Sequence, residues 1–232
     1  MKNSKTVLFA AGICLISSSV FAQKSTIITA FLKHNIDTNI LDPDIKQRPE
    51  DVSFDYKYTS IAAGKEKVTL AKFDATKNGD ERWIVLSVNG DSPSATEIST
   101  YQKEHRKPKV PAAKTDTTTM KVEKENQDQL VISYKLDATT IPSEVSFLKD
   151  CRNYLTINLG TKKLEQLQML SEKPVKIKII KANKVDLNIK YIFDEKLNKY
   201  LPISEDLNID VKFLGQVASM ETISEYSNYS KK

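Results

Sequence analysis

The residues best suited to nucleophilic or acid–base catalysis are scarce in this chain, which has two histidines, His34 and His105, and two cysteines, Cys14 and Cys151. A catalytic cysteine needs a neighbouring group, most often a histidine, to stabilise its thiolate. A histidine that acts as a general base needs a hydrogen-bonding partner to orient it. The sequence indicates no such partner. We therefore interpret Cys151 as a small buried or half-buried residue, and both histidines as structural.

Motifs for the common reaction classes are absent as well. The sequence contains no Gly-rich phosphate loop, no HExxH zinc motif, no GxSxG serine-hydrolase motif and no cysteine–histidine cluster that could bind a metal. Its many Asp and Glu residues fall on the polar sides of alternating segments. We expect a protein that is not an enzyme and that uses neither a cofactor nor a metal.

The first 22 residues have the parts of a secretory signal peptide. Lys2 and Lys5 make a basic start, residues 7–16 are apolar, and Val20-Phe21-Ala22 offers the small residues that a signal peptidase reads. The apolar run is too short to cross a bilayer as a mature helix, so a retained membrane anchor is the weaker interpretation. We predict cleavage after Ala22 and a periplasmic protein without a transmembrane span.

Residues 23–232 have the length of one sizeable domain. The chain carries a formal net charge of +5, and cleavage lowers this by two, since the signal peptide holds two lysines and no acid. Lysines alternate with acids along most segments, which argues against a nucleic-acid partner. Only Cys151 survives cleavage, so no disulfide can form within the mature chain, and a hydrophobic core must hold the domain together.

Apolar and polar residues alternate with period two over most of the domain, which indicates antiparallel strands with one face exposed to solvent. The segments are 52–58, 68–72, 82–88, 130–136, 155–159, 164–169, 175–179, 185–193, 200–202, 207–213 and 217–226. A sheet of roughly ten strands curls, and its apolar concave face must be covered. We predict an α+β fold, in which two or three helices cover a single curved, half-barrel-like antiparallel meander.

Three segments are the candidates for these helices. Ser25–Ile36 has apolar residues at helical spacing and is expected to pack on the core, with a membrane-surface helix as the alternative. A second helix is expected after the strand that holds Trp83, because Ser94 and Glu97 form a capping box. Pro142–Asp150 is the third segment. Between strands, Lys107–Thr119 lacks periodicity and is predicted to be a flexible surface linker within the single domain.

Two stretches carry a family resemblance: ERWIVLSVNG with the SPS and Glu97 that follow it, and YIFDEKLNKYLPISEDLNIDVKFLG with ISEYSNYSK. They resemble exported bacterial proteins related to the LolA/LolB-type periplasmic lipoprotein carriers and sorting proteins. The resemblance spans most of the mature chain in strand order. It implies a half-barrel whose hollow holds acyl chains, with lipids or lipoproteins as partners. Arg48 and Arg82 are the candidates for the arginine on which those carriers depend.

Our leading hypothesis is a periplasmic carrier or binding protein for an amphipathic, lipid-like ligand, with the N-terminal helix as a lid. The alternative is a non-enzymatic cell-envelope interaction or structural protein, in which the same apolar face is packed core. The sequence does not settle which set of alternating residues on each strand faces inward. A shift of one residue in register would move every side chain to the other face. The candidate ligand-binding residues are Phe54, Tyr56, Leu70, Ile177, Ile179, Leu187, Ile189, Ile209 and Phe213.

The signal peptide yields a direct prediction. We expect the exported protein to begin at Gln23, because Val20-Phe21-Ala22 follows an apolar core of signal-peptide length. N-terminal sequencing of protein recovered from the periplasm tests this expectation. Recovery of a chain that still begins at Met1 would contradict it.

Overall fold

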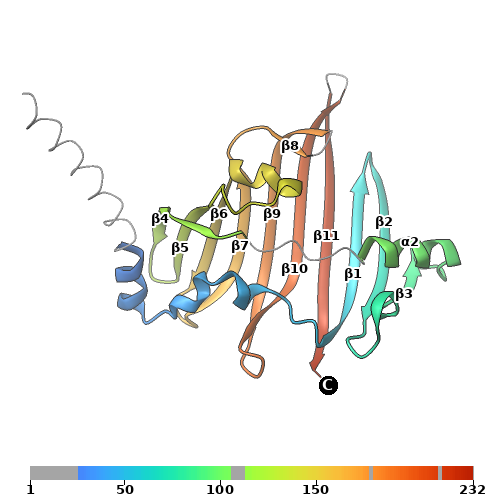
Figure 1. Ribbon diagram of the computed structural model, residues 1–232, viewed down its shortest axis with the longest axis horizontal. Coiled ribbons are helices and arrows are strands. Elements are labelled where there is room, and N and C mark those ends of the chain that lie inside the picture. Colours follow the sequence, from blue (N-terminus) through green and yellow to red (C-terminus); the bar gives the residue numbers. More distant parts are fainter. Residues whose placement is uncertain (1–25, 106–112, 178–179, 214–215, 232) are drawn as a thin grey trace, which may run out of the picture.

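The computed structural model describes residues 26–105, 113–177, 180–213 and 216–231. These residues form one open, curved antiparallel sheet of eleven strands, with helices on one face (Figure 1). The predicted α+β fold is thereby confirmed. The predicted signal peptide, residues 1–22, and the expected start at Gln23 lie outside the described residues.

The sheet is built from two meanders that meet in its middle. Its spatial order is β3-β2-β1-β11-β10-β9-β7-β6-β5-β4, and β8 pairs with β9 alone. The first and last strands are therefore neighbours, and the chain crosses from β3 at one edge to β4 at the other. The strands are β1 (Val52–Ala62), β2 (Lys65–Phe73), β3 (Trp83–Val88), β4 (Thr115–Glu125), β5 (Gln129–Leu136), β6 (Cys151–Asn158), β7 (Lys163–Ser171), β8 (Val175–Ile177), β9 (Ile180–Asp194), β10 (Lys199–Phe213) and β11 (Gln216–Lys231).

Two boundaries differ from the sequence prediction. Residues 200–202 and 207–213 were expected as separate strands, but they belong to one strand, β10, whose register against β9 shifts between Pro202 and Ser204. An irregularity of this kind lets a strand accommodate proline, which lacks the N–H that a regular ladder needs.

The predicted linker, Lys107–Thr119, also needs correction at its end. Thr115–Thr119 belong to β4, although residues 106–112 lie outside the described residues. Hydrogen bonds support this polar stretch in the sheet: the Thr119 hydroxyl accepts from the Lys135 N–H of β5. Within β4 itself, the Asp116 carboxylate accepts from the Thr118 N–H and hydroxyl. Polar pairing therefore replaces the apolar periodicity on which the prediction relied.

All the helices that contribute side chains to the hydrophobic clusters lie on the same face of the sheet, called here the covered face. Among the described residues, no helix is long and apolar enough to cross a membrane. The helices are residues 26–34, the 3₁₀ helices η1 (Thr38–Leu41), η2 (Pro43–Lys46), η3 (Gly79–Arg82) and η4 (Ser143–Asp150), and the α-helix α2 (Ala95–His105).

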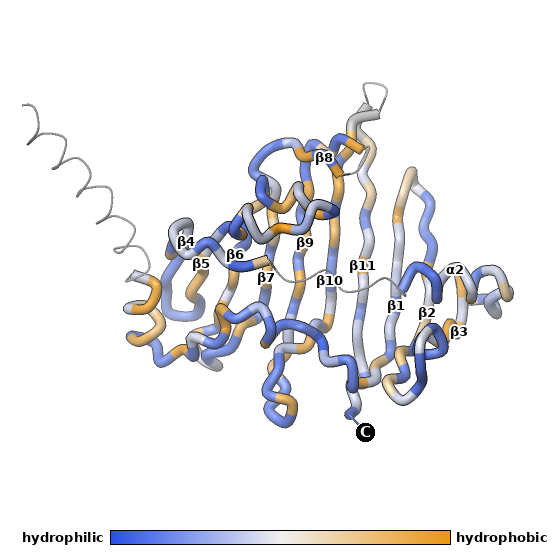
Figure 2. Tube along the Cα trace, in the orientation of Figure 1, coloured by the Kyte–Doolittle hydropathy of each residue, from blue (hydrophilic) through white to orange (hydrophobic). Residues whose placement is uncertain are grey.

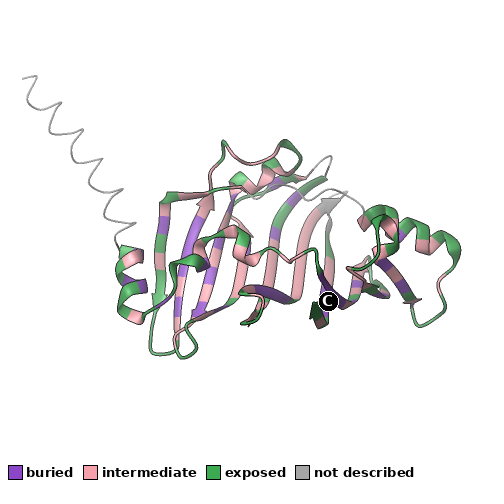
Figure 3. Cartoon of the chain, turned by 60° about the horizontal axis from the view of Figure 1, so that its bottom comes forward, coloured by how far each residue is buried: buried purple, intermediate pink, exposed green. Residues whose placement is uncertain are grey.

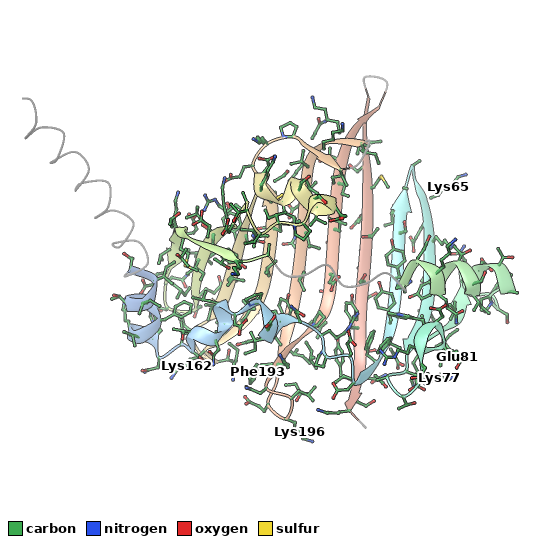
Figure 4. The ribbon with its side chains drawn as sticks, in the orientation of Figure 1. Lys65, Lys77, Glu81, Lys162, Phe193 and Lys196 are labelled. Atoms are coloured by element: carbon green, nitrogen blue, oxygen red, sulfur yellow. The ribbon has the colours of Figure 1, made fainter. Side chains whose placement is uncertain are left out.

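The strand registers define the two faces of the sheet. Residues directly opposite one another share a face, and the row Leu155, Leu167, Ile189, Glu205 and Ser224 runs through five neighbouring strands on the covered face. The opposite parity carries polar side chains, so hydrophobic and hydrophilic residues alternate along most strands (Figure 2). Charged side chains such as Lys65, Lys77, Glu81, Lys162 and Lys196 project from the turns at the strand ends (Figure 4).

Polar side chains on the outer face bind one another across strands. The Gln166 amide donates to Asn188 at 2.9 Å, and the Gln168 amide donates to Asp186 at 2.8 Å. The Asn188 amide also donates to Asp186, and Asn208 donates to Asp206 in the same way. The first two hydrogen bonds join β7 to β9, and the other two lie within β9 and within β10. Together they satisfy polar side chains on the solvent side of the sheet without an apolar cover.

Three hydrophobic clusters line the covered face. The N-terminal cluster packs Ile27 and Phe31 of helix 26–34 onto β5, β6 and β7. The η4 cluster joins Phe147 and Leu148 to β6, β8 and β9. The aromatic cluster packs α2 onto β1, β2, β3 and β11, and consists of Phe54, Tyr56, Ala71, Trp83, Val85, Val88, Tyr101 and Tyr226.

The start of α2 has the predicted capping box. The Ser94 hydroxyl accepts from the Glu97 N–H at 3.3 Å, and the Glu97 carboxylate accepts from the Ser94 N–H at 2.9 Å. Asn89, in the turn before it, takes a φ of 53°, and its side chain accepts from the Val68 N–H at 2.8 Å. The stretch from Trp83 to Glu97 therefore has a structural role: it positions α2 over β2 and β3.

Removal of the N-cap of α2 should lower the stability of the protein. We expect Ser94→Ala to lower the free energy of unfolding by about 1 kcal/mol, because the Glu97 N–H loses its acceptor. Ser99→Ala is the matched control in the middle of α2, where alanine favours the helix, and it should change stability by less than about 0.5 kcal/mol. Chemical denaturation measures both values. Equal effects of the two substitutions would show that the cap contributes nothing.

Candidate functional site

The structure places most of the predicted ligand-binding residues on one face. Ile179 and the side chain of Phe213 lie outside what the structure describes. The residues that share the covered face are Phe54, Tyr56, Ile177, Leu187, Ile189 and Ile209.

Leu70 is the exception, and its assignment to the inner face was wrong. It lies opposite Lys57 on the outer face, and it is 40% exposed. On β2 the covered positions belong instead to Thr69 and Ala71, which lie opposite Tyr58 and Tyr56. Small residues are required there because the tyrosines of β1 and helix α2 fill the space above them. The prediction chose Leu70 because it is a large apolar residue, and it thereby assigned the wrong set of alternating β2 residues to the inner face.

The middle of the covered face carries an apolar band of half-buried side chains. It consists of Leu187, Ile189, Leu207, Ile209 and Val211, with Met220 of β11 beside Ile209. Met220 is 41% exposed, whereas Leu130, Ile132 and Leu155 beneath the N-terminal helix are fully buried. Figure 3 shows this change along the sheet, from buried residues on the strands at one end to intermediate burial on its middle strands.

A polar cluster interrupts the apolar surface at one end of the band. Glu205 of β10 lies opposite Ile189 on one side and opposite Ser224 on the other. Its carboxylate accepts a hydrogen bond from the Tyr226 hydroxyl. The Tyr56 hydroxyl and the Ser224 hydroxyl form a further hydrogen bond of 2.8 Å. Glu205 is thus the acidic member of a covered row that is otherwise apolar or hydroxylic.

Arg48 completes the cluster from the segment that follows η2. The carbon at the centre of its guanidinium lies 4.4 Å from the ring centroid of Phe54 and 5.2 Å from that of Tyr226. This is the geometry of a cation–π contact. Tyr226 therefore touches both charged groups, with its ring against Arg48 and its hydroxyl on Glu205.

Burial controls the protonation of the cluster. Loss of solvation raises the pKa of Glu205 more than Arg48 and the Tyr226 hydroxyl lower it. Burial likewise raises the pKa of Tyr56 to about 12, and it raises the pKa of Tyr226. Both tyrosines are therefore neutral at physiological pH. The cluster combines one guanidinium and one carboxyl group with uncharged hydroxyls.

The Glu205 and Tyr226 positions were missed by sequence reasoning, although a signal was present. Glu205 has the same strand parity as Leu207, Ile209 and Val211, so it is a charge on the apolar side of an alternating segment. Arg48 appeared only as one of two candidate arginines. The other, Arg82, donates to the Lys77 carbonyl at 2.9 Å and stabilises the turn before β3.

The histidines and the cysteine have structural environments. Cys151 is buried, its thiol donates to the Phe147 carbonyl at 3.6 Å, and burial raises its pKa to about 11. His105 stacks on Tyr101 with a centroid distance of 3.9 Å, and His34 lies 2.8 Å from Glu125. No group of residues that could hold a metal ion occurs in the described ranges.

A separate small cavity lies between α2 and the β2–β3 hairpin. Its volume is about 220 Å³, and its lining consists of Lys67, Thr69, Val85, Val88, Thr96, Glu97, Thr100, Tyr101 and Glu104. Tyr101 is 8% exposed, and its hydroxyl has no hydrogen-bond partner among the described residues. The cavity is smaller than the roughly 300–1,000 Å³ of a typical small-molecule site, and its rim is charged. It therefore fits an acyl chain less well than the apolar band does.

Comparison of the chain with known protein families, with characterised proteins and with solved structures found no match. The resemblance to LolA/LolB-type carriers therefore stays a prediction from the quoted stretches.

Two of the three buried tyrosine hydroxyls of the aromatic cluster, those of Tyr101 and Tyr56, should respond oppositely to removal. Tyr101→Phe should raise the free energy of unfolding by about 1 kcal/mol, because it deletes a buried hydroxyl that has no partner among the described residues. Tyr56→Phe should lower the free energy of unfolding by about 1 kcal/mol, because the Ser224 hydroxyl then loses its partner. Urea denaturation of both variants tests the pair. A loss of stability in Tyr101→Phe would mean that a bound water or ligand satisfies its hydroxyl.

Proposed function

We propose that this protein is a non-enzymatic carrier or binding protein for an amphipathic ligand with an acyl chain. One observation supports this proposal above the others: the covered face keeps half-buried apolar side chains in its middle and ends them at a half-buried carboxyl group and guanidinium group, those of Glu205 and Arg48. A packed core has no need of such an arrangement. A ligand with an apolar chain and a polar end matches it.

The apolar band supplies the surface for the chain. A hydrocarbon chain gains about 0.8 kcal/mol for each methylene that it buries, so about eight methylenes contribute roughly 6 kcal/mol. Leu187, Ile189, Leu207 and Ile209 lie on two adjacent strands, so their side chains form one continuous apolar surface. The chain would run along β9 and β10, and its polar end would lie at Glu205.

The N-terminal helix does not suit the role of a lid that the sequence-based hypothesis gave it. Ile27 and Phe31 are 1% and 0% exposed within the N-terminal cluster, and Lys33 and His34 contact Glu125 of β4. Opening this helix would expose a large part of the core. The elements beside the band are η2, which contacts β10, and η4, which contributes to the same cluster as the band residues Leu187, Leu207, Ile209 and Val211. The ligand would therefore reach the band through the space between these two elements.

An envelope interaction protein without a small ligand is the second candidate. It is favoured by apolar side chains away from the band that stay exposed, among them Leu86 at 55% and Ile192 at 46%. An exposed apolar side chain of this kind can contact a partner protein. Under this alternative the apolar band would bind no probe.

A charge in the apolar band separates the two candidates. We expect the wild-type protein to bind a fluorescent fatty-acid analogue saturably, and Ile189→Lys to weaken binding by about tenfold or more, because the ammonium group would replace an apolar side chain of the surface on which the chain lies. Leu70→Lys is the matched control, since it introduces the same charge on the outer face. Fluorescence titration measures binding, and circular dichroism reports whether each variant folds.

Met220→Lys adds a milder test at an exposed position of the band, in case Ile189→Lys does not fold. It should weaken binding as well, by a smaller factor than Ile189→Lys. The carrier proposal fails if the wild-type protein takes up no probe, or if the Met220 and Leu70 variants bind the probe equally well. In either case the interaction protein becomes the better explanation.

A further inference from the structure

We propose that the small cavity between α2 and the β2–β3 hairpin is a second binding site, and that its ligand is a small aliphatic amine that also carries a hydroxyl group. In this assignment Glu104 of α2 binds the ammonium group and Thr69 of β2 binds the hydroxyl group. The carbon chain of the ligand lies on the apolar floor of the cavity. The site is independent of the apolar band and of the carrier function proposed for that band.

The size and floor of the cavity suit a short carbon chain. The cavity lies where α2 covers the β2–β3 hairpin (Figure 1). Val85, Val88 and Tyr101 line it, and each of them is 8% exposed. Its volume is about 220 Å³. One water takes roughly 30 Å³ of the liquid, so this space holds about seven non-hydrogen atoms. A long acyl chain exceeds that space, whereas a short amino alcohol fits it.

Thr69 supplies the buried polar group of the lining. It lies on the covered face, opposite Tyr58 and Val88, and it is 4% exposed. Its hydroxyl forms no hydrogen bond with another residue of the described ranges. Native proteins pair nearly all their buried polar groups, because an unpaired one is costly. A ligand that brings a hydroxyl group to Thr69 would therefore be favoured over a purely hydrocarbon one.

The charges of the lining favour a cation. Lys67 contributes one positive charge, and Glu97 and Glu104 contribute two negative charges, so the formal charge of the lining is −1. Glu97 is already engaged: hydrogen bonds from Ser94, and after them the charge of Lys67, hold its pKa below the usual value. Glu104 forms no ion pair with another described residue. An ammonium group would supply the partner that this carboxylate lacks.

The position of Glu104 on α2 supports the same conclusion. Glu97 and Glu104 are seven residues apart, so they lie about two turns apart on one face of the helix. Glu104 belongs to the last turn, where the backbone carbonyls form the negative end of the helix dipole and favour a cation. Lys103 and His105 are in the same turn, but neither of them lines the cavity. The cavity thus presents a carboxylate and a negative helix end together.

The test compares four compounds of similar size: terminal aminopentanol, pentylamine, hexanol and terminal hydroxypentanoate. Isothermal titration calorimetry gives their affinities. Trp83, the one tryptophan of the chain, lies 5.7 Å from the ring of Tyr101 and provides a fluorescence signal. We expect aminopentanol to bind with a millimolar Kd, as is typical of so small a ligand. It should bind about tenfold more tightly than hexanol and hydroxypentanoate, and about threefold more tightly than pentylamine.

Substitutions assign each group of the ligand. Glu104→Gln should weaken aminopentanol binding by about tenfold and leave hexanol binding unchanged. Glu66→Gln is the matched control, because Glu66 lies opposite Ile61 on the outer face of the same hairpin, and it should change no affinity. Thr69→Val should lower the affinity of aminopentanol to that of pentylamine. Thr100→Leu, at an exposed position of the lining, should weaken all four compounds and keeps the test decisive if the Thr69 variant does not fold.

Several results would overturn the assignment. They are the absence of binding by all four compounds at tens of millimolar, equal affinities for the four, tightest binding of hydroxypentanoate, and an unchanged affinity for aminopentanol in Glu104→Gln. Aminopentanol should also leave the fluorescent fatty-acid analogue bound, and displacement of that probe would show that the two sites are one. Binding of the probe by itself decides the carrier proposal, so the two proposals can fail separately.

Discussion

The pairing of the first strand with the last holds the structure together. β1 and β11 run antiparallel from Val52 opposite Lys231 to Ala62 opposite Met220, and they unite a three-stranded meander with the rest of the sheet. Without this pairing, Tyr56 would not meet Tyr226, and Arg48, which comes just before β1, would not lie over that ring. The aromatic cluster and the polar cluster both depend on contacts between residues that are far apart in the chain.

Packing on the covered face explains where the side chains of the sheet are fully buried and where they are only half-buried. Helix 26–34 and α2 fill the space over the two ends, and small residues such as Ala71 lie beneath the larger side chains. Between those ends the side chains of β9 and β10 are only half-buried, and Glu205 adds a charge that an apolar core would exclude. The same sheet therefore combines a core that stabilises the fold with a surface that suits an amphipathic molecule.

Local patterns predicted much of this fold. Period-two alternation located nearly all the strands, and Ser94 with Glu97 located the start of α2, because both signals arise from neighbouring residues. Long-range features were not accessible in the same way. The β1–β11 pairing, the unbroken course of β10 through Pro202 and the outward position of Leu70 depend on which strand lies beside which. For the site, alternation correctly grouped Leu187 and Ile189, but it did not bring Arg48, Glu205 and Tyr226 together, since tertiary contacts alone unite them.

The central position of β11 has a consequence for how the chain reaches its native state. The strand follows all the other described strands along the chain, as Gln216–Lys231, yet it lies between β1 and β10 in the middle of the sheet. Until it arrives, both of those strands present bare backbone edges that are prone to pair with other chains. Closure of so large a loop is intrinsically slow. A chain in which β11 has not yet paired therefore has two unprotected strand edges in the middle of its future sheet, where the native state has none.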